Sequence, residues 1–521
     1  AIVCLLLGSF CVLSARDLSK TQDGKIKHAA MKQYDRLVND AWRMRWHLSP
    51  PDSNWWDINA AFDINGQYHL AFLRFLLNDD GTRPGTGDVS NWGHATSRDL
   101  FHWRFRPDIF VIGDLEKTPS YYSGHSVAGA PKPTIIVYVK RRGIFVAQAT
   151  DDTLENWEFL NNGEPVIPSL KEKREYVVFD PFAWFDEKTQ TYLALIGNNN
   201  GRPGHQGSPS LFSSQDLIAW TYLGPVMKAQ SGWLSEREDT ACVDFFPLGD
   251  KGKWVMICHV HYPYYHTRVM VGTFDGKEFF PENLTRMGGA HSYLFAPETF
   301  YDHTKKRRIY FGTTKGAGVG RSAAAIQPLE LRLGKDNELE YYPLEELNAL
   351  KFNEREFLNK EINGEQTLEG IGSLSMMLET LIDMKDAQAA GVKLACSPDG
   401  KEHIAFEYVP AKKIFRVDFK NSIQGKDNAV QKYDARSAEG GFDEKITSID
   451  IPFELKPNEK LFIQIFRDGA FYEVIVNHRA FTAAPIYSTD KNSTQVRLHT
   501  SGGAAIFEKI KTADIDASMS L

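Results

Sequence analysis

The sequence predicts an all-β fold, a five-bladed β-propeller over residues 49–345 followed by a C-terminal β-sandwich over residues 366–515. Two separate patterns recur about every 60 residues in the first part of the chain, which is typical of propeller blades. In the last part, short runs such as residues 412–419 and 461–466 alternate apolar and polar side chains between Gly and Asp turns. Such alternation is typical of an antiparallel sandwich.

The first pattern is a short apolar run, which we expect to form one buried strand in each blade. The five runs begin 54 to 66 residues apart, so each fits one repeating unit of several strands. They comprise residues 68–72, 134–139, 191–196, 254–258 and 308–311.

The second pattern is a hydroxyl residue followed by an acid, a leucine and a tryptophan, in residues 97–103, 150–157 and 213–220. The closing tryptophans are 54 and 63 residues apart, which agrees with the spacing of the apolar runs. We expect the third strand of a blade to end at the hydroxyl residue, an acidic turn to follow, and the tryptophan to open the outermost strand.

Polar residues precede each apolar run by about ten to twelve positions, and most of them are acidic. Residues at matching positions of different blades converge on the central axis of a propeller. The architecture therefore predicts a polar axial site and makes the chain a candidate enzyme. The set comprises Asp57, Ser123, His125, Asp180, Asp244 and Glu298.

The segments outside the two modules are expected to serve secretion and linkage. Residues 1–15 are apolar and are followed by polar sequence, as in a signal peptide, so a secreted or periplasmic location is expected. Residues 16–48 are charged and partly helical in pattern, and we expect them to pack outside the propeller. Residues 346–365 are again charged and are predicted to form a linker helix.

The charge and composition of the chain argue against several partners. The formal net charge is −7, and basic residues are neither in excess nor clustered, so no nucleic-acid partner is expected. No segment after the signal peptide is long enough to cross a membrane. His259, His261 and His266 lie close in sequence without a clear carboxylate partner. They are therefore predicted to form a polar pocket rim, and no metal or cofactor is expected.

Several short motifs follow one another in a definite order. They are Trp46-His-Leu-Ser-Pro-Pro51 with Asp57-Ile-Asn59, Asn91-Trp-Gly-His-Ala-Thr-Ser-Arg-Asp-Leu-Phe-His-Trp103, Phe179-Asp-Pro181, Cys242-Val-Asp-Phe-Phe246 and Ala296-Pro-Glu-Thr-Phe300. Together with residues 329–332, 370–373 and 396–400, they resemble the five-bladed β-fructosidases of glycoside hydrolase family 32. The resemblance covers nearly everything after the signal peptide.

The resemblance implies hydrolysis of a fructoside with retention of configuration. In this family an aspartate attacks the anomeric carbon, a glutamate protonates the leaving oxygen, and a further aspartate holds sugar hydroxyls. Retaining chemistry needs two carboxyls about 5–5.5 Å apart, one ionised and one protonated. Asp57 matches the nucleophile and Asp180 matches the stabilising aspartate, so a carbohydrate substrate is expected.

The chain departs from the family pattern at the proton donor, because Ala241 stands where the family has glutamate. Glu238 and Asp239 lie three and two residues earlier, and either could bring a carboxyl into the same space. The general acid is therefore predicted to be Asp239 or Glu238. Phe179 replaces the arginine before the stabilising aspartate, which predicts a substrate other than plain sucrose.

Five further residues are predicted to contact the sugar. Trp56 offers a large apolar face for stacking, and Trp92 lies in the motif that matches the pocket region of the family. Asn59, His125 and Glu298 add polar groups near the predicted axis.

Two other functions remain open. Ala241 favours a carbohydrate-binding protein that has kept the scaffold and lost turnover, whereas Asp57 and Asp180 favour an enzyme. A hydrolase of a related five-bladed family that acts on pentose polymers would also use three axial carboxylates. The Trp-Gly-His-Ala sequence at residues 92–95 and the predicted sandwich favour the fructosidases.

Overall fold

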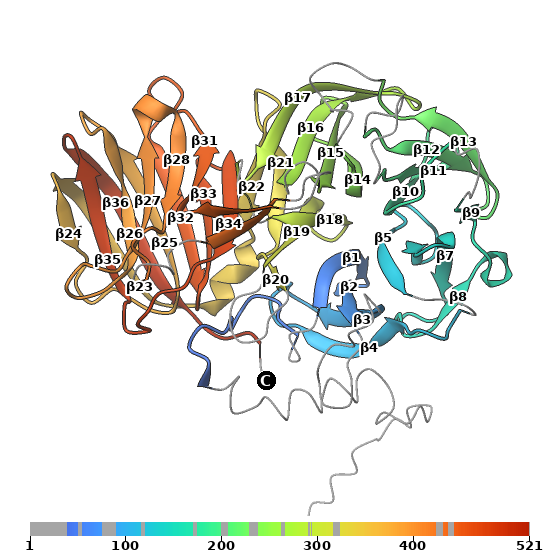
Figure 1. Ribbon diagram of the computed structural model, residues 1–521, viewed down its shortest axis with the longest axis horizontal. Coiled ribbons are helices and arrows are strands. Elements are labelled where there is room, and N and C mark those ends of the chain that lie inside the picture. Colours follow the sequence, from blue (N-terminus) through green and yellow to red (C-terminus); the bar gives the residue numbers. More distant parts are fainter. Residues whose placement is uncertain are drawn as a thin grey trace, which may run out of the picture.

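The computed structural model shows two all-β modules side by side, a propeller and a sandwich (Figure 1). Five sheets are arranged around a central axis, and two six-stranded sheets form the second module. The fold predicted from the sequence is confirmed. The structure describes residues 39–50, 55–75, 90–115, 120–169, 175–198, 207–228, 238–261, 266–289, 292, 294–315, 323–423, 431–435 and 442–519.

Each blade is an antiparallel sheet whose strands follow one another outward from the axis. The predicted apolar runs all lie in the second strand of a blade, where neighbouring strands and blades bury them. The blades are β1 (Trp55–Ile64), β2 (Gln67–Phe75), β3 (Ser90–Ser97), β4 (Arg104–Phe110); β5 (Tyr121–Ser126), β6 (Thr134–Val139), β7 (Gly143–Ala149), β8 (Trp157–Phe159), with η1 (Asn161–Gly163) and β9 (Ile167–Pro168); β10 (Pro181–Asp186), β11 (Thr191–Ile196), β12 (Ser210–Ser214), β13 (Trp220–Pro225); β14 (Ala241–Leu248), β15 (Lys253–Val260), β16 (His266–Phe274), β17 (Phe279–Met287); and β18 (Phe295–Asp302), β19 (Arg307–Lys315), β20 (Ala323–Ala325), β21 (Leu329–Leu333), β22 (Leu339–Pro343).

The hydroxyl–acid–Leu–Trp pattern forms the same turn in three blades. In blade 1 the backbone N–H of Leu100 donates to Ser97 Oγ at 2.9 Å, and Trp103 Nε1 donates to the Leu100 carbonyl at 3.0 Å. The tryptophan bond holds Leu100 in a left-handed conformation, with φ of 67°, that leucine rarely adopts. Equivalent bonds from Trp157 and Trp220 confirm the predicted turn in blades 2 and 3.

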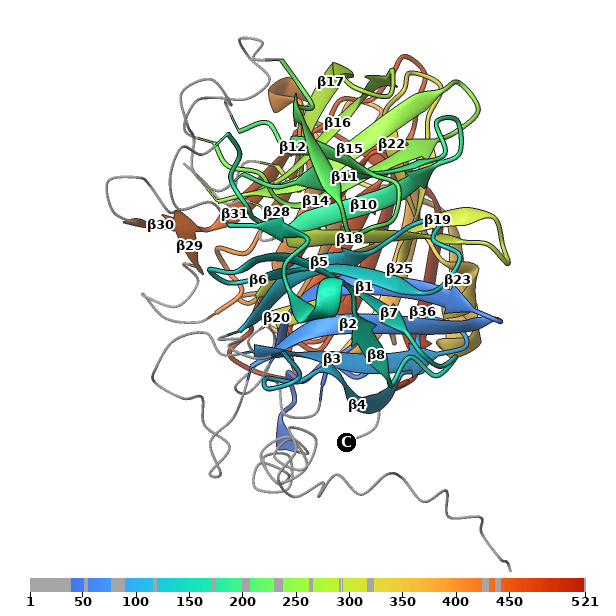
Figure 2. The same ribbon diagram turned by 90° about the vertical axis from the view of Figure 1, so that its right-hand side faces the viewer.

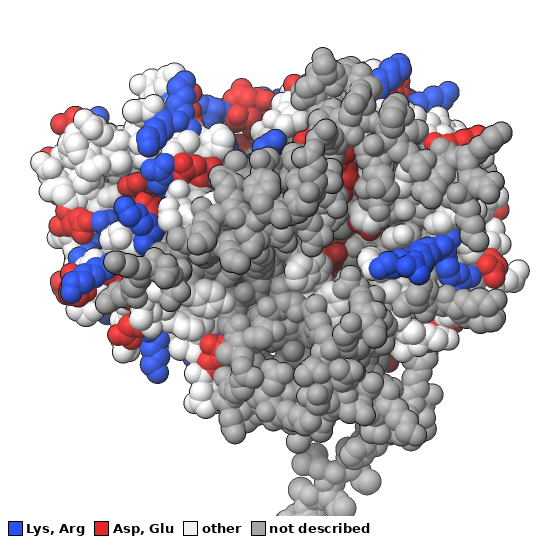
Figure 3. Space-filling model, in the orientation of Figure 1, with Lys and Arg blue, Asp and Glu red and all other residues white. Residues whose placement is uncertain are grey.

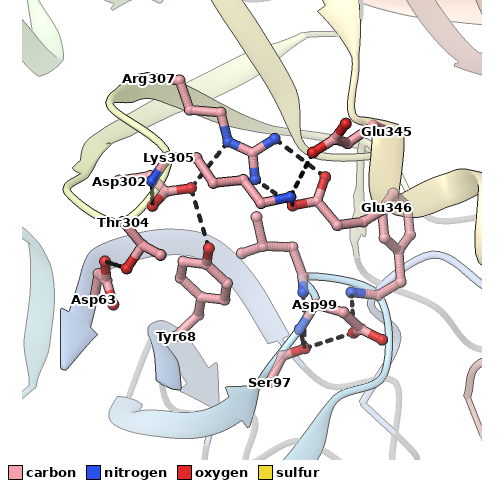
Figure 4. Close-up of polar contacts among 12 residues, drawn as sticks. Asp63, Tyr68, Ser97, Asp99, Asp302, Thr304, Lys305, Arg307, Glu345 and Glu346 are labelled. Carbon is pink, nitrogen blue, oxygen red and sulfur yellow. Dashed lines mark hydrogen bonds and ion pairs between the residues drawn. The ribbon is translucent and has the colours of Figure 1, made fainter. Parts of the chain in front are cut away.

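Blades 1 and 5 are joined by a buried polar network that closes the propeller (Figure 4). The Tyr68 hydroxyl of blade 1 donates to Asp302 Oδ2 of blade 5 at 3.1 Å, and Arg307 Nε donates to the same oxygen at 2.9 Å. The other side of the Arg307 guanidinium pairs with Glu346, just beyond the last blade. One guanidinium therefore ties the closing hairpin to the start of the connection between the modules.

The predicted linker helix at residues 346–365 is wrong. The chain forms one 3₁₀ helix, η2 (Glu345–Leu350), and then the long strand β23 (Lys351–Ile362), which pairs antiparallel with the last strand of the sandwich. The many Glu, Lys and Arg residues favour a helix by intrinsic propensity, but this weak preference is overridden by strand pairing. Their side chains point to solvent along the edge of the sheet, where charges also discourage edge-to-edge association.

The sandwich buries its own apolar core between two sheets. A further hairpin, β29 (Gln431–Ala435) with β30 (Phe442–Ile446), extends outward from it (Figure 2). The short helix η3 (Pro410–Lys412) connects two strands. The sheets run β23, β36 (Ala505–Ile515), β25 (Ser375–Asp383), β32 (Leu461–Asp468), β33 (Phe471–Val476), β34 (Ala480–Pro485), and β24 (Glu365–Thr367), β35 (Gln495–Ser501), β26 (Ala389–Cys396), β27 (Ile404–Val409), β28 (Ile414–Asp418), β31 (Ser448–Pro452).

The segment before the propeller binds the sandwich through two buried carboxylates. Asp468 accepts hydrogen bonds from the backbone N–H groups of Arg45, Trp46 and His47, at 2.7 to 3.1 Å. The His47 ring lies between Asp468, 2.9 Å from Nδ1, and Glu473, 3.2 Å from Nε2. We call this set of residues the junction cluster.

The N-terminal predictions can be followed only in part. The predicted signal peptide, residues 1–15, and residues 16–38 of the predicted lead-in lie outside the described residues. Residues 39–48 of the lead-in lie beside the sandwich and contribute to a core shared by both modules. Among the described residues, no helix is long and apolar enough to cross a bilayer.

Candidate active site

A cavity of about 360 Å³ lies at the propeller axis, where the innermost strands of the five blades begin. Four of these strands, β1, β5, β14 and β18, carry an irregularity or bulge at this end, and a bulge redirects side chains out of the regular alternation. The wall includes polar groups of Asp57, Ser123, Asp180, Cys242, His259 and His261 and the aromatic rings of Trp56, Tyr122, Phe179 and Phe295.

Asp57 projects into this cavity from the irregular start of β1. Its Oδ2 accepts a hydrogen bond from Ser123 Oγ at 2.9 Å, while the carboxyl is only 8% exposed. Burial and the charge of Asp180 raise the pKa of Asp57 to about 7, although the Ser123 bond and the charge of His261 act to lower it. Near neutral pH this carboxyl therefore exchanges between its ionised and protonated forms.

Asp180 precedes β10 and faces the same cavity. Its Oδ2 accepts the backbone N–H of Cys242 at 3.0 Å and lies 3.4 Å from the Cys242 thiol. Burial raises the pKa of Asp180 to about 6, and the Cys242 amide acts to lower it. Cys242 reaches this position through a left-handed backbone, with φ of 43°, within the bulge of β14.

The blades that carry Asp180 and Cys242 are held together next to the site. Asn198 and Thr240 exchange two backbone hydrogen bonds, of 2.9 and 2.7 Å, and so link blades 3 and 4. Gly197 allows this approach, because a Cβ there would lie 2.5 Å from the Thr240 carbonyl oxygen. Because this bridge holds blades 3 and 4 together, it also keeps the Cys242 amide within hydrogen-bond distance of the Asp180 carboxylate.

Asp244, Glu298 and His125 form a separate buried layer beneath the cavity. His125 Nε2 lies 3.3 Å from Glu298 Oε2 and 3.6 Å from Asp244 Oδ2, and the two carboxyls are 1% and 0% exposed. None of the three is among the described residues that line the cavity, and His125 instead lines a second cavity of about 240 Å³. Contact of His125 and Glu298 with the sugar stays a prediction.

Strand register explains why the predicted convergence divides into two layers. Ser123 stands one residue before regular pairing resumes at Gly124, and Asp57 lies in the irregular stretch of β1, which pairs regularly only from Ala60. Asp244 is itself the first regularly paired residue of β14, and Glu298 holds the same place in β18. A one-residue difference turns a side chain to another direction on a strand, so similar sequence offsets did not give one shared site.

Of the other predicted sugar contacts, one lines the cavity and two are not among its described lining residues. Trp56 lines the cavity, with its ring centroid 5.0 Å from that of Phe295, and its contact with the sugar stays a prediction. Trp92 is fully buried, donates Nε1–H to the Tyr122 carbonyl at 2.8 Å and packs on Phe110, so it supports the wall from behind. Asn59 is 1% exposed and is not among the described lining residues.

The two predicted proton donors lie beside the cavity and are engaged by basic groups. Asp239 accepts hydrogen bonds from the backbone N–H and from Nδ1 of His261, both at 2.6 Å. Glu238 Oε1 lies 2.7 Å from an Arg268 nitrogen, in a buried ion pair. Neither carboxyl is among the described lining residues, whereas His261 is, and their role as proton donor stays a prediction.

Sequence reasoning did not identify the Cys242 amide or the link between Asp239 and His261. The position of this amide depends on the bulge of β14, and no residue type in the sequence predicts that bulge. The Asp239–His261 link depends on strand register, since Ala241 pairs with His259 and the same register places Asp239 opposite His261. The His-x-His spacing at residues 259–261 was the available signal, and it led to a predicted pocket rim that both histidines form.

The described residues also bear on whether the protein could hold a metal ion. No group of three or more His, Cys, Asp or Glu among them is arranged to hold a metal ion. Lys and Arg are interspersed with Asp and Glu over the described part of the face in Figure 3.

The chain thus joins a five-bladed propeller, with the buried carboxyls Asp57 and Asp180 on the wall of its axial cavity, to a β-sandwich. Residues 47–321 match the glycosyl hydrolases family 32 N-terminal domain, and residues 346–514 match the C-terminal domain of that family. The chain belongs to glycoside hydrolase family 32.

Individual relatives are distant. An insoluble β-fructofuranosidase isoenzyme of Daucus carota is 26% identical over 371 residues, which cover 62% of this chain and 59% of that enzyme. The levanase of Bacillus subtilis is 24% identical over 92% of this chain and 70% of its own length. A variant of fructan 1-exohydrolase IIa from Cichorium intybus, solved with 1-kestose, superposes with a TM-score of 0.74 at 18% identity, covering 92% of this chain and 98% of that one.

Proposed function

We propose that this protein is a retaining glycoside hydrolase that cleaves a fructoside linkage. The observation that carries the proposal is the pair Asp57 and Asp180, two buried carboxyls with raised pKa values on the wall of one cavity. Perturbed carboxyls in a cavity mark sites of acid–base and nucleophilic chemistry. Relatives named β-fructofuranosidase and levanase support the fructoside as substrate class.

In this proposal the two carboxyls have different roles. Asp57, in its ionised form, attacks the anomeric carbon and forms a covalent fructosyl ester, which water later hydrolyses. Asp180 stabilises the positive charge that develops on the sugar in both transition states. The Cys242 amide holds the Asp180 carboxylate toward the cavity while this charge forms and disappears.

The cavity suits one fructosyl unit at its base. Its volume of about 360 Å³ is at the small end of the usual range for ligand sites. The Trp56 and Phe295 rings offer apolar surface to one face of a sugar, and Phe179 offers an apolar side chain where the family has an arginine. We propose a fructan or fructosyl oligosaccharide in preference to plain sucrose. A secreted location is part of the proposal and is supported by the apolar residues 1–15.

The test is fructose release from sucrose, inulin, levan and mixed plant oligosaccharides by the full chain and by Asp57→Asn. We expect release from at least one substrate and a loss of about 10³-fold or more in the variant, because the nucleophile is removed. Asp63→Asn, on the same strand but away from the cavity, is the matched control and should keep full activity.

The second candidate function is carbohydrate binding without turnover, which Ala241 favours. Ala241 leaves the family's proton-donor position without a carboxyl, and general acid catalysis contributes about 10²–10⁴-fold to such reactions. If the full chain and Asp57→Asn both bind sugar and neither releases fructose, this alternative is established.

A further inference from the structure

His261 and Asp239 form a hydrogen-bonded pair beside the position that Ala241 occupies. Ala241 pairs with His259 at the start of β14 and β15. Two residues further in the same register, Asp239 and His261 face each other. The carboxylate of Asp239 accepts hydrogen bonds from both the backbone N–H and Nδ1 of His261, each at 2.6 Å.

Asp239 determines how the His261 ring is presented. The carboxylate is 1% exposed and binds His261 at two points, so the imidazole is fixed in orientation. With Nδ1 bound to a carboxylate, a proton exchanged with a ligand must travel on Nε2, at the other side of the ring. A buried aspartate of this kind also stabilises the imidazolium that forms when the ring takes a proton.

His261 belongs to the cavity that holds the two carboxyls. It lines the cavity beside His259, with the ring centroids 4.5 Å apart, and its side chain is 24% exposed. The charge of His261 acts on both Asp57 and Asp180, lowering the pKa of each, so the ring lies within electrostatic reach of the reacting pair.

Glu238 is less suited to this task. It is buried in an ion pair with Arg268, 2.7 Å away, and protonating it would leave that guanidinium buried without its partner. Asp239 would likewise have to release His261 before it could reach a ligand.

We propose that His261, positioned by Asp239, is the proton donor and acceptor of the hydrolysis, in place of the glutamate that the chain lacks. The inference rests on the proposed function. In the first step Asp57 forms a bond to the anomeric carbon, the glycosidic C–O bond breaks, and the leaving oxygen takes the proton from His261 Nε2. In the second step a water oxygen attacks the same carbon, His261 Nε2 takes the proton of the water, and the bond to Asp57 breaks. The net reaction adds one water and returns every protein group to its starting state.

The deciding variant is His261→Asn, whose side-chain amide can keep a hydrogen bond to Asp239 but has no second nitrogen for proton transfer. It is compared with the full chain and with His102→Gln, a control on an exposed turn of blade 1. Each is assayed on a fructo-oligosaccharide and on an aryl fructoside, whose good leaving group needs little protonation, with and without azide. Circular dichroism and thermal unfolding report whether each variant is folded.

We expect His261→Asn to lose about 10²–10⁴-fold on the oligosaccharide and much less in the first step on the aryl fructoside. Azide attacks without a general base, so it should restore turnover of the aryl substrate and give fructosyl azide as product. A merely structural role would give equal losses on both substrates and no azide rescue, and that result overturns the inference. Unchanged oligosaccharide hydrolysis by the folded variant overturns it as well.

The same assay separates this inference from the proposed function. If the full chain cleaves only the aryl fructoside, in a reaction that needs Asp57, the nucleophile is established and the assignment of His261 is overturned. If the full chain cleaves neither substrate, the proposed function fails and the inference fails with it.

Asp239 is a positioning residue in this scheme and has its own readout. Asp239→Asn removes the charge that stabilises the imidazolium, so it should lower turnover of the oligosaccharide more than turnover of the aryl fructoside. An equal loss on both substrates would contradict that role.

Discussion

The junction cluster and the axial cavity both bury carboxylates, but they satisfy them differently. Asp468 accepts three consecutive backbone N–H groups and the His47 ring. At the cavity, by contrast, Asp57 accepts a bond from Ser123 and otherwise faces the cavity and the charge of Asp180, and its pKa is raised to about 7. Burial alone therefore does not indicate function, whereas burial with few donors beside an open cavity does.

The difference has a consequence for stability. A carboxylate surrounded by donors stabilises the folded chain, and removing it leaves those donors buried without an acceptor. A carboxyl whose pKa is raised in the folded state favours unfolding increasingly as the pH rises from its unfolded value to the raised value, and by a constant amount above it. The cavity carboxyls are thus expected to lower the free energy of unfolding, whereas the carboxylates of the junction cluster are expected to raise it.

The largest expected effect is at the junction. Asp468→Asn should lower the free energy of unfolding by about 3–5 kcal/mol, because it breaks a buried ion pair and weakens three backbone hydrogen bonds. Urea unfolding followed by tryptophan fluorescence measures the change. A loss under 1 kcal/mol would remove the distinction between the two regions, as judged beside the exposed control Asp399→Asn.

The next effect concerns catalysis at the cavity. Asp180→Asn should lower kcat by about 10²–10³-fold, because it removes the charge that stabilises the transition state. The same change should not destabilise the chain at pH 8, since the pKa of Asp180 is raised by burial. Steady-state kinetics and urea unfolding on one preparation test both parts. A stability loss as large as that of Asp468→Asn would place Asp180 with the structural carboxylates.

A third prediction concerns pH and the junction histidine. Burial acts to lower the pKa of His47, but the charge of Glu473 and hydrogen bonds to Asp468 and Glu473 raise it to about 9. The resulting stability is fully present below the unfolded value of about 6.5 and is lost as the pH rises through about 9, amounting to about 3 kcal/mol. His47→Gln should flatten this part of the curve of unfolding free energy against pH. An unchanged slope between pH 6.5 and 9 would contradict the assigned protonation.

The smallest effect is a shift in the pH dependence of hydrolysis. Activity should rise with pH through about 7 as Asp57 ionises. Ser123→Ala removes a hydrogen bond that lowers the pKa of Asp57, so the acidic limb of kcat/KM should move to higher pH by up to about one unit. Ser126→Ala, further along the same strand and outside this cavity, is the control. A shift to lower pH would contradict the assigned hydrogen bond.

The fold could be predicted because each of its repeats produces a pattern among residues that are close in sequence. The apolar runs and the Trp-closed turns such as Ser97 to Trp103 each depend on neighbours in sequence, and both are confirmed. The strand at residues 351–362 was missed for the opposite reason. Its partner is β36, more than a hundred residues away, and no local pattern shows that pairing.

The site could be predicted only as far as residue identity carries it. Asp57 and Asp180 lie on one cavity wall, as their matching positions suggested. Glu298 and His125 lie in a deeper layer because they stand one and two residues further along their strands, relative to the irregularity, than Ser123 does. The contact between Asp239 and His261 joins residues 22 apart through strand pairing, which only the folded chain shows.

The most direct test of the account is a paired measurement on Asp57→Asn at pH 8, with fructose release and urea unfolding taken from one preparation. At this pH the raised pKa of Asp57 makes its carboxylate unfavourable in the folded state. We predict that hydrolysis falls by about 10³-fold or more while the free energy of unfolding rises by about 1–3 kcal/mol. A variant that keeps its activity, or that loses stability as Asp468→Asn is expected to, would contradict the assignment of the axial cavity as the active site.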